Sequence, residues 1–426
     1  MSFLWLTRRN GRSRRQGTRR ALLVALALLC GLSEGALAER AGLSGLARLS
    51  AAASFKQFID EFWPVARRAG ISRKTYRRAF SGLEPDWEVL ARQEKQPEFT
   101  TPVWRYIERR VSSERIAKGR ALLRKHARLL RALELKYGVD RHILLAIWGI
   151  ESNFGAHKGR KAVIRSLATL AYTGRRQKYG CNQLIAALKI LQSGDITLTG
   201  MTGSWAGAMG HTQFIPTTYL GYAVDFDRDG RRDIWNSISD ALASTANYLA
   251  KRGWRRGLPW GWEVRLPKGF NYALAGMHHG RRIRDWERLG VRPAAAKRFY
   301  ARHEKAWILL PAGSRGPAFL VTRNFRAILA YNQSHAYALA VGRLAHRIAG
   351  GRPLVARWPV QDRLLTRSER IELQKMLARE GLYRGAFEGH IGPKTRAAVR
   401  RFQQAAGLPA DGYVNASLLE RLRRGR

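Results

Sequence analysis

The chain has 426 residues and a formal net charge of +46, from 77 lysines and arginines against 31 aspartates and glutamates. This length allows two or three domains, and two cysteines exclude a disulfide-stapled miniprotein. A hydrophobic content of 45% with 13 tryptophans excludes a wholly disordered polybasic chain, because such chains lack apolar surface to bury. The positive charge predicts an acidic partner: nucleic acid, an anionic membrane surface or an acidic polysaccharide.

Residues 1–38 have the pattern of an export signal peptide. An arginine-rich segment precedes an apolar run over residues 21–29, and Ala36-Leu37-Ala38 then offers small residues for cleavage. The apolar run is too short for a membrane-spanning helix, so a retained anchor is the weaker alternative. Export makes intracellular DNA a poor candidate for the acidic partner. Removal of residues 1–38 would also remove Cys30, so Cys181 would have no intrachain disulfide partner.

Helix dominates the first half of the chain, where apolar and basic residues alternate at helical spacing. The expected elements, in chain order, are helical segments over 55–80 and 111–137, β-like segments at 263–266, 307–310 and 319–322, and one helix over 324–348. Gly350-Gly351-Arg352-Pro353 breaks this helix and begins a predicted linker, residues 351–361. Residues 362–426 follow as a small unit with helices expected at 371–379 and 393–406.

Residues 142–155 place a carboxyl group on an apolar helix. Leu144, Trp148 and Glu151 share one face, near a helix end predicted at Gly155. Partial exclusion of water raises the pKa of a carboxyl group, which suits a residue that holds a proton at neutral pH and then donates it. Glu151 is therefore a candidate general acid; the alternative is a glutamate that simply points into solvent.

Residues 203–219 combine small residues with hydrogen-bonding side chains. Glycines and alanines allow close approach of a ligand to the backbone, and Ser204, Gln213 and Tyr219 can donate and accept bonds to hydroxyls and amides. Trp205 can stack on a sugar ring. A glycine-rich turn packed against a helix is the alternative.

Residues 225–236 have the spacing of an EF-hand calcium loop. Oxygen-bearing side chains fall at positions 1, 3, 5, 9 and 12, with glycine at position 6. The predicted metal set is Asp225, Asp227, Asp229, Arg231, Asp233 and Asn236. Asn236 stands where a bidentate glutamate usually completes the site, which predicts weaker binding of a structural Ca²⁺ or Na⁺. The alternative is an acidic turn paired with neighbouring arginines.

Together with residues 331–337, these segments make the chain from about Phe55 to Ala349 resemble the B-type lytic murein transglycosylases. Gln96-Pro97-Glu98-Phe99 and residues 247–254 belong to the same resemblance. It implies a lysozyme-like helical domain over 52–350 that cleaves the glycan strands of peptidoglycan in the periplasm. It also implies that Glu151 is the catalytic acid, and that the substrate-binding residues are Ser204, Gln213, Tyr331, Asn332 and Tyr337, with Arg175 and Arg176 in support. Members of this family carry a similar single metal loop.

The reaction that the resemblance implies needs one enzyme carboxylate rather than two. Ordinary glycosidases use a pair. Here Glu151 would protonate the glycosidic oxygen, and the N-acetyl group of the muramoyl unit would stabilise the developing positive charge. Glu151 would then take the proton of the C6 hydroxyl, which gives a 1,6-anhydro product without any cofactor. Lysozyme-type hydrolysis with a second carboxylate, brought close by folding, is the chemical alternative.

Residues 362–426 resemble the small three-helix peptidoglycan-binding domain. The matching residues include Gly381-Leu382-Tyr383, Gly392-Pro393-Lys394-Thr395, Phe402-Gln403 and Asp411-Gly412, whereas Glu388 and His390-Ile391 depart from the pattern. A second site on the same polymer raises the effective concentration of substrate at the active site. A helical domain that binds protein partners is the alternative.

The fold class expected is thus mainly α, with small β elements in the catalytic domain and a three-helix C-terminal domain. A non-catalytic wall-binding scaffold and a nucleic-acid binder are the competing function classes, but no nucleic-acid-binding motif is present and the basic residues are spread along the chain. The expected partner is peptidoglycan. Further candidates are cell-wall synthesis or division proteins and the membrane surface.

Overall fold

The computed structural model describes residues 54–94 and 101–425, and the described residues from Phe55 onward belong to one compact unit. The predicted signal peptide over residues 1–38 and the motif Gln96-Pro97-Glu98-Phe99 lie outside the described residues. Within the described ranges, no helix is both long and apolar enough to cross a membrane.

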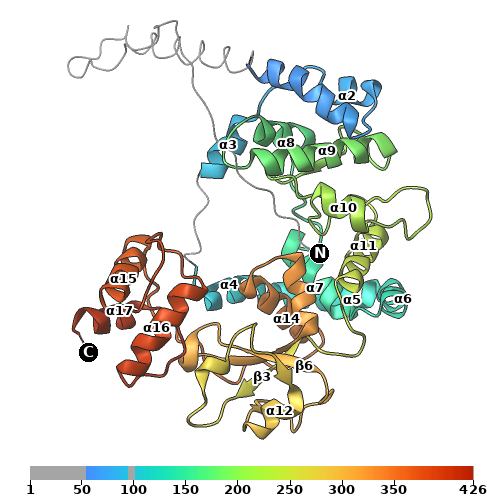
Figure 1. The fold of residues 1–426 in the computed structure, drawn as a ribbon. Helices are drawn as coiled ribbons and strands as arrows, with labels where there is room; N and C mark the ends of the chain where they lie inside the picture. Colours follow the sequence, from blue (N-terminus) through green and yellow to red (C-terminus); the bar gives the residue numbers. More distant parts are fainter. Residues whose placement is uncertain (1–53, 95–100, 426) are drawn as a thin grey trace, which may run out of the picture. The chain divides into compact units, whose positions relative to one another are not determined.

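Helices build the main core, and the prediction of a mainly α fold is confirmed (Figure 1). They comprise a helix over 54–68, α2 (Arg73–Phe80), α3 (Trp87–Glu94), α4 (Val103–Arg110), α5 (Ser113–Lys125), α6 (Ala127–Tyr137), α7 (Arg141–Ser152), α8 (Val163–Tyr172), α9 (Gln177–Ser193), α10 (Pro216–Tyr222), α11 (Ile238–Lys251), α13 (Arg323–Tyr331) and α14 (His335–Ile348). Helix α7 lies at the centre, because every residue from Ile143 to Ile150 is buried. Helices α14, α5, α6 and α11 all pack against it.

Two small antiparallel sheets accompany the helices. Strand β1 (Lys161–Ala162) pairs with β2 (Thr202–Gly203), which begins the glycine-rich segment. A five-stranded sheet has the order β4-β6-β7-β3-β5, with strands β3 (Gly261–Arg265), β4 (Arg281–Arg282), β5 (Arg292–Pro293), β6 (Lys305–Leu309) and β7 (Ala318–Thr322). Its own core, around Ile283 and Trp286 of α12 (Ile283–Arg288), is separate from the helical core. The three β segments expected from the sequence are thus confirmed as β3, β6 and β7.

The single helix expected over 324–348 is wrong, because the chain forms two helices there. Helix α13 ends at Tyr331, and Asn332 takes an extended conformation with φ of −146°. The Ser334 hydroxyl then caps α14 by accepting the backbone N–H of Tyr337 at 3.3 Å. The break carries no proline or glycine, so breaker residues do not reveal it.

The C-terminal module has three helices, α15 (Arg367–Arg379), α16 (Pro393–Ala405) and α17 (Ala416–Arg423), around its own core. Asp362 accepts two bonds from Arg315 at 2.6 and 2.7 Å, and Asp411 accepts the backbone N–H of Ser314 at 2.7 Å. Residues 351–361 have no helix or strand, but the backbone N–H groups of Val355 and Ala356 donate to Glu263 of β3. The predicted linker is therefore held to strand β3 by hydrogen bonds.

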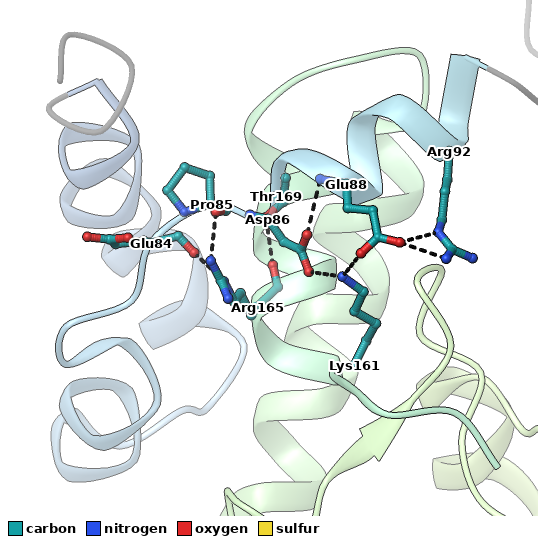
Figure 2. Close-up of polar contacts among 8 residues, drawn as sticks. All are labelled: Glu84, Pro85, Asp86, Glu88, Arg92, Lys161, Arg165 and Thr169. Atoms are coloured by element: carbon teal, nitrogen blue, oxygen red, sulfur yellow. Dashed lines mark hydrogen bonds and ion pairs between the residues drawn. The ribbon is translucent and has the colours of Figure 1, made fainter. Parts of the chain in front are cut away.

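A polar network fixes the start of α3 against α8 and β1 (Figure 2). The Lys161 ammonium lies between two carboxylates, 2.8 Å from Asp86 and 2.5 Å from Glu88. Arg165 donates to the carbonyls of Glu84 and Pro85. Hydrogen bonds from Lys161, the larger cause, and from Arg92 lower the pKa of Glu88. This network anchors α3 immediately before the chain reaches residues 95–100.

Replacing Lys161 by Met is expected to destabilise the protein by about 1–2 kcal/mol. Asp86 is only 8% exposed, so its carboxylate would lose its ammonium partner in a poorly hydrated place. Arg92→Met is the matched control, because Arg92 and Glu88 both lie in solvent and exposed pairs contribute little. Thermal unfolding measures both variants. Equal Tm values for the two would contradict a structural role for the network.

Candidate active site

Glu151 lies in the last turn of α7, where the backbone ends the helix in an unusual way. Asn153 and Phe154 have positive φ values of 51° and 58°, and Gly155 follows with 85°. Successive residues in the left-handed conformation turn the chain back sharply. This conformation is sterically unfavourable for residues other than glycine and is therefore rare for them. The Phe154 ring then packs where Gly149 has no side chain, since a Cβ there would lie 2.7 Å from it. The local fold therefore fixes the position of the Glu151 backbone.

The Glu151 carboxyl group is held by a phenol. Tyr337 of α14 donates its hydroxyl to Glu151 Oε1 at 2.6 Å, and Tyr337 itself is 2% exposed. Burial raises the pKa of Glu151 to about 7, although the Tyr337 bond and the positive charge of Arg110 both oppose this rise. At neutral pH a large fraction of Glu151 is therefore protonated, as a general acid requires.

Arg110 of α4 is the cation whose charge acts on Glu151 and lowers its pKa. Its guanidinium donates to the carbonyl of Ile150 at 3.2 Å and lies 5.4 Å from the ring centre of Tyr106. Among the described residues, no carboxylate contributes to the pKa shift of Glu151. The groups that act on the pKa of Glu151 are thus one phenol, Tyr337, and one guanidinium, Arg110.

A buried imidazole joins the glycine-rich segment to the end of α7. His211 Nδ1 accepts the indole N–H of Trp148 at 3.0 Å, and Ser152 donates its hydroxyl to the His211 carbonyl. Burial lowers the pKa of His211 to about 4, so the ring is neutral and can accept this bond. Gly155 must lack a side chain here, since a Cβ would lie 2.5 Å from the imidazole. His211 thereby fixes the segment over residues 203–219 against α7, the helix that carries Glu151.

Tyr331 is the last residue of α13 and bonds to the segment over residues 203–219, to which Gln213 belongs. Tyr331 donates its hydroxyl to the carbonyl of Thr212 at 2.5 Å, and burial and the charge of Glu151 raise the pKa of Tyr331. Gln213 has a positive φ of 54°, and its amide nitrogen donates to the carbonyls of Lys158 and Gly210. That amide nitrogen is thus engaged within the protein.

Ser204 and Asn332, two other residues predicted to bind substrate, form no hydrogen bond with Glu151 among the described residues. Ser204 Oγ accepts the backbone N–H groups of Ala206 at 3.3 Å and Ala208 at 3.0 Å, which holds the glycine-rich turn. Asn332 is exposed just after α13. The Trp205 ring faces the Arg176 guanidinium at 5.5 Å. Of the five residues predicted to bind substrate, Tyr337 is the one that forms a hydrogen bond with Glu151.

The predicted metal loop brings three of its carboxylates together. Ligand oxygens of Asp225, Asp227 and Asp229 all lie within 4.8 Å of one another, a donor set that suits a hard cation. The carboxylate of Asp233 instead accepts the backbone and side-chain N–H groups of Asn236 at 2.9 Å, so these two side chains pair locally. Arg231 forms an ion pair with Asp229 at 3.7 Å.

Sequence reasoning missed Asp240, the residue that ties this loop to α11. Asp240 is fully buried and accepts the backbone N–H groups of Phe226 at 2.7 Å and Asp233 at 2.8 Å. Arg110 was missed as well, because nothing in the sequence distinguishes one arginine among 77 basic residues. His211 lies within residues 203–219, but its role depends on a contact with Trp148, 63 residues away in the chain.

Two family models match the chain. Residues 54–346 match the transglycosylase SLT domain, and residues 366–422 match the putative peptidoglycan-binding domain. The first match contains Glu151 and every predicted substrate and metal residue. The second contains α15 and α16 and all of α17 except its last residue.

Several known proteins are similar to the chain. The crystal structure of SltB3 from Pseudomonas aeruginosa in complex with NAG-anhNAM-pentapeptide has 54% identity and a TM-score of 0.84, over 87% of this chain and 99% of that one. Escherichia coli membrane-bound lytic murein transglycosylase B is 28% identical over 69% of this chain and 82% of its own length. Escherichia coli Slt35 in complex with calcium has 28% identity and a TM-score of 0.58, over 70% of this chain and 92% of that one.

Proposed function

The chain belongs to the transglycosylase SLT family, and on this premise we propose that it is a lytic transglycosylase of peptidoglycan with Glu151 as its catalytic residue. The bond cleaved is the one between N-acetylmuramic acid and N-acetylglucosamine, and the product ends in 1,6-anhydromuramic acid. The observation that carries the proposal is the single carboxyl group of Glu151, whose pKa is about 7 and whose position Tyr337 fixes.

In the proposed mechanism Glu151 acts twice. Its proton passes to the glycosidic oxygen as the C1–O bond breaks, and the N-acetyl group of the muramoyl unit stabilises the positive charge at C1. The carboxylate left behind keeps the hydrogen bond from Tyr337 and the attraction of Arg110. It then removes the proton of the C6 hydroxyl as the oxygen closes on C1, which returns Glu151 to its protonated form.

The remaining predicted site residues take positioning and substrate-binding roles in this proposal. Tyr331 and Tyr337 orient the carboxyl group and its surroundings, and Gln213, Ser204 and Asn332 lie on the segments that would face the sugar. Ser204 and Gln213 also hold their own turns, so their replacement would disturb both structure and binding.

A test of this function is the mass of the products released from purified sacculi. A lytic transglycosylase leaves a muramoyl end that lacks one water relative to a hydrolysed end. Hydrated ends alone would show lysozyme-type hydrolysis, and binding of sacculi without soluble products would show a non-catalytic scaffold.

We further propose that the enzyme works outside the cytoplasm, after removal of residues 1–38, with the periplasm as its compartment. A wall polymer that bears peptide carboxylates then accounts for the acidic partner expected from the charge. The module over 362–426 would bind a second stretch of this polymer, while residues 351–361 join it to the catalytic domain over 52–350.

The acidic loop is proposed as a structural site for Ca²⁺ or Na⁺, separate from the chemistry. Asp225, Asp227 and Asp229 would hold the ion, and the match to Slt35, whose structure contains calcium, supports this assignment. Asp233 and Asn236 would add to the site only after their mutual bonds break, which predicts modest affinity.

Calcium is expected to raise the Tm of the protein, because an ion that binds only the folded state stabilises it. At a concentration about 100 times Kd the gain is about 2.7 kcal/mol. Asp229→Asn keeps the shape of the loop but removes one charge, so it should reduce this gain, whereas the exposed Asp60→Asn should not. Calorimetric titration with no heat at millimolar Ca²⁺ would rule out the metal site.

A further inference from the structure

A cavity of about 450 Å³ lies where the helical core meets the five-stranded sheet, and the proposed reaction does not use it. Its lining includes His142 and Ile143 at the start of α7, and Arg343 and His346 near the end of α14. Glu151 lies about 12–14 Å from His142 and Ile143 along α7, at about 1.5 Å per residue. We call this site the junction cavity.

Aromatic rings line the junction cavity from both cores. Trp254 and Trp260 pack against the helical core, whereas Trp262 packs against the core of the sheet. Tyr300 also lines the cavity and is 54% exposed, and its ring centre lies 5.2 Å from that of Trp262 at an angle of 77°. Partly exposed indole and phenol faces in a concave site are suited to stacking on sugar rings.

Among the described residues, some tryptophans donate their indole N–H groups within the protein, and the three cavity tryptophans do not. The indole N–H groups of Trp148, Trp235 and Trp286 all donate within the protein. The indole N–H groups of Trp254, Trp260 and Trp262 have no hydrogen bond to another residue in the described part of the chain. Three donors are thereby left for a ligand.

A buried guanidinium adds further donors. Arg343 is 8% exposed, lines the cavity and donates to the Arg352 carbonyl at 3.1 Å. Two arginines, Arg343 and Arg352, balance the two carboxylates of Asp140 and Glu263 in the lining. This balance favours a neutral ligand over an anion, and the volume lies within the range of about 300–1,000 Å³ typical of small-ligand sites.

We propose that the junction cavity is a second saccharide-binding site, which holds a short neutral stretch of N-acetylated glycan by stacking and by hydrogen bonds from indole and guanidinium groups. The choice of this glycan rests on the proposed function, since a strand held here would raise the concentration of the same polymer at Glu151. Binding at the cavity is nevertheless independent of turnover.

The probe is a β-1,4-linked tetramer of N-acetylglucosamine, titrated into the full chain carrying Glu151→Gln. Indole ¹⁵N–¹H signals of the three cavity tryptophans, assigned with single Trp→Phe variants, are expected to shift and saturate. Tyr300→Ala should raise the Kd from this titration about tenfold, whereas Tyr300→Phe, which keeps the ring, should leave the Kd unchanged. Because Tyr300 is largely exposed, neither change should lower the Tm appreciably.

In an otherwise unaltered enzyme, Tyr300→Ala should raise KM for sacculi and leave kcat for short glycans unchanged. Indole signals of the cavity tryptophans that do not move, or a Tyr300→Ala protein that binds as the parent does, would overturn the proposal. Failure of the proposed function would appear elsewhere, as release of anhydro products by the Glu151→Gln chain, and it would leave the binding result intact.

Discussion

A Glu151→Gln protein is expected to release anhydro-ended products from sacculi at least about a thousandfold more slowly than the parent chain. General acid catalysis alone contributes about 10²- to 10⁴-fold, and here one carboxyl group donates a proton and later removes another. Glutamine has the same shape, and its carbonyl oxygen can still accept the hydroxyl of Tyr337, which lies 2.6 Å from Glu151. The loss should therefore appear in kcat, with little change in Tm.

Glu114→Gln is the matched control for this experiment. Glu114 is an exposed glutamate in the first turn of α5, so the same chemical change there should leave turnover intact. Sacculus binding by the Glu151→Gln protein should also persist. Product release at more than a tenth of the parental rate would show that another group supplies the proton.

The second large effect is on the pH dependence of the reaction. The pKa of Glu151 is about 7 and the protonated form is the active acid, so the rate should fall as pH rises through this value. Tyr337 bonds to the carboxylate and thereby lowers the pKa of Glu151, so Tyr337→Phe should raise it and move the fall in rate to higher pH. The lost positioning bond should also reduce the maximal rate about tenfold.

Arg110→Met separates these two consequences of the tyrosine change. The charge of Arg110 also lowers the pKa of Glu151, but its guanidinium donates to the Ile150 carbonyl rather than to the carboxyl group. This variant should therefore move the profile in the same direction with a smaller loss of maximal rate. Rate profiles from pH 4 to 9 measure both variants. A shift to lower pH in either one would contradict the account.

Sequence patterns predict the centre of the site because short-range spacing determines it. The apolar face of residues 142–155 predicts a buried helix, and this burial raises the pKa of Glu151. Tyr337 could be identified only through a family resemblance, since its contact with Glu151 spans 186 residues. Arg110 and Asp240 could not be found, because their roles depend on which distant elements pack together.

Two further differences have local causes. The break between α13 and α14 depends on a serine cap rather than on proline or glycine, so hydrophobic spacing alone predicts one long helix. In the metal loop, spacing places Asp233 and Asn236 as candidate ligands, whereas the folded loop pairs them with each other. In both places side-chain bonds to nearby backbone compete with the pattern.

The most direct test of the central claim is digestion of purified sacculi in water enriched with ¹⁸O, followed by mass spectrometry of the muramoyl ends. If Glu151 directs the sugar's own C6 hydroxyl to C1, the ends will lack one water and carry no ¹⁸O. Muramoyl ends that retain the water and carry ¹⁸O would show that solvent attacks C1, and they would contradict the single-carboxyl mechanism.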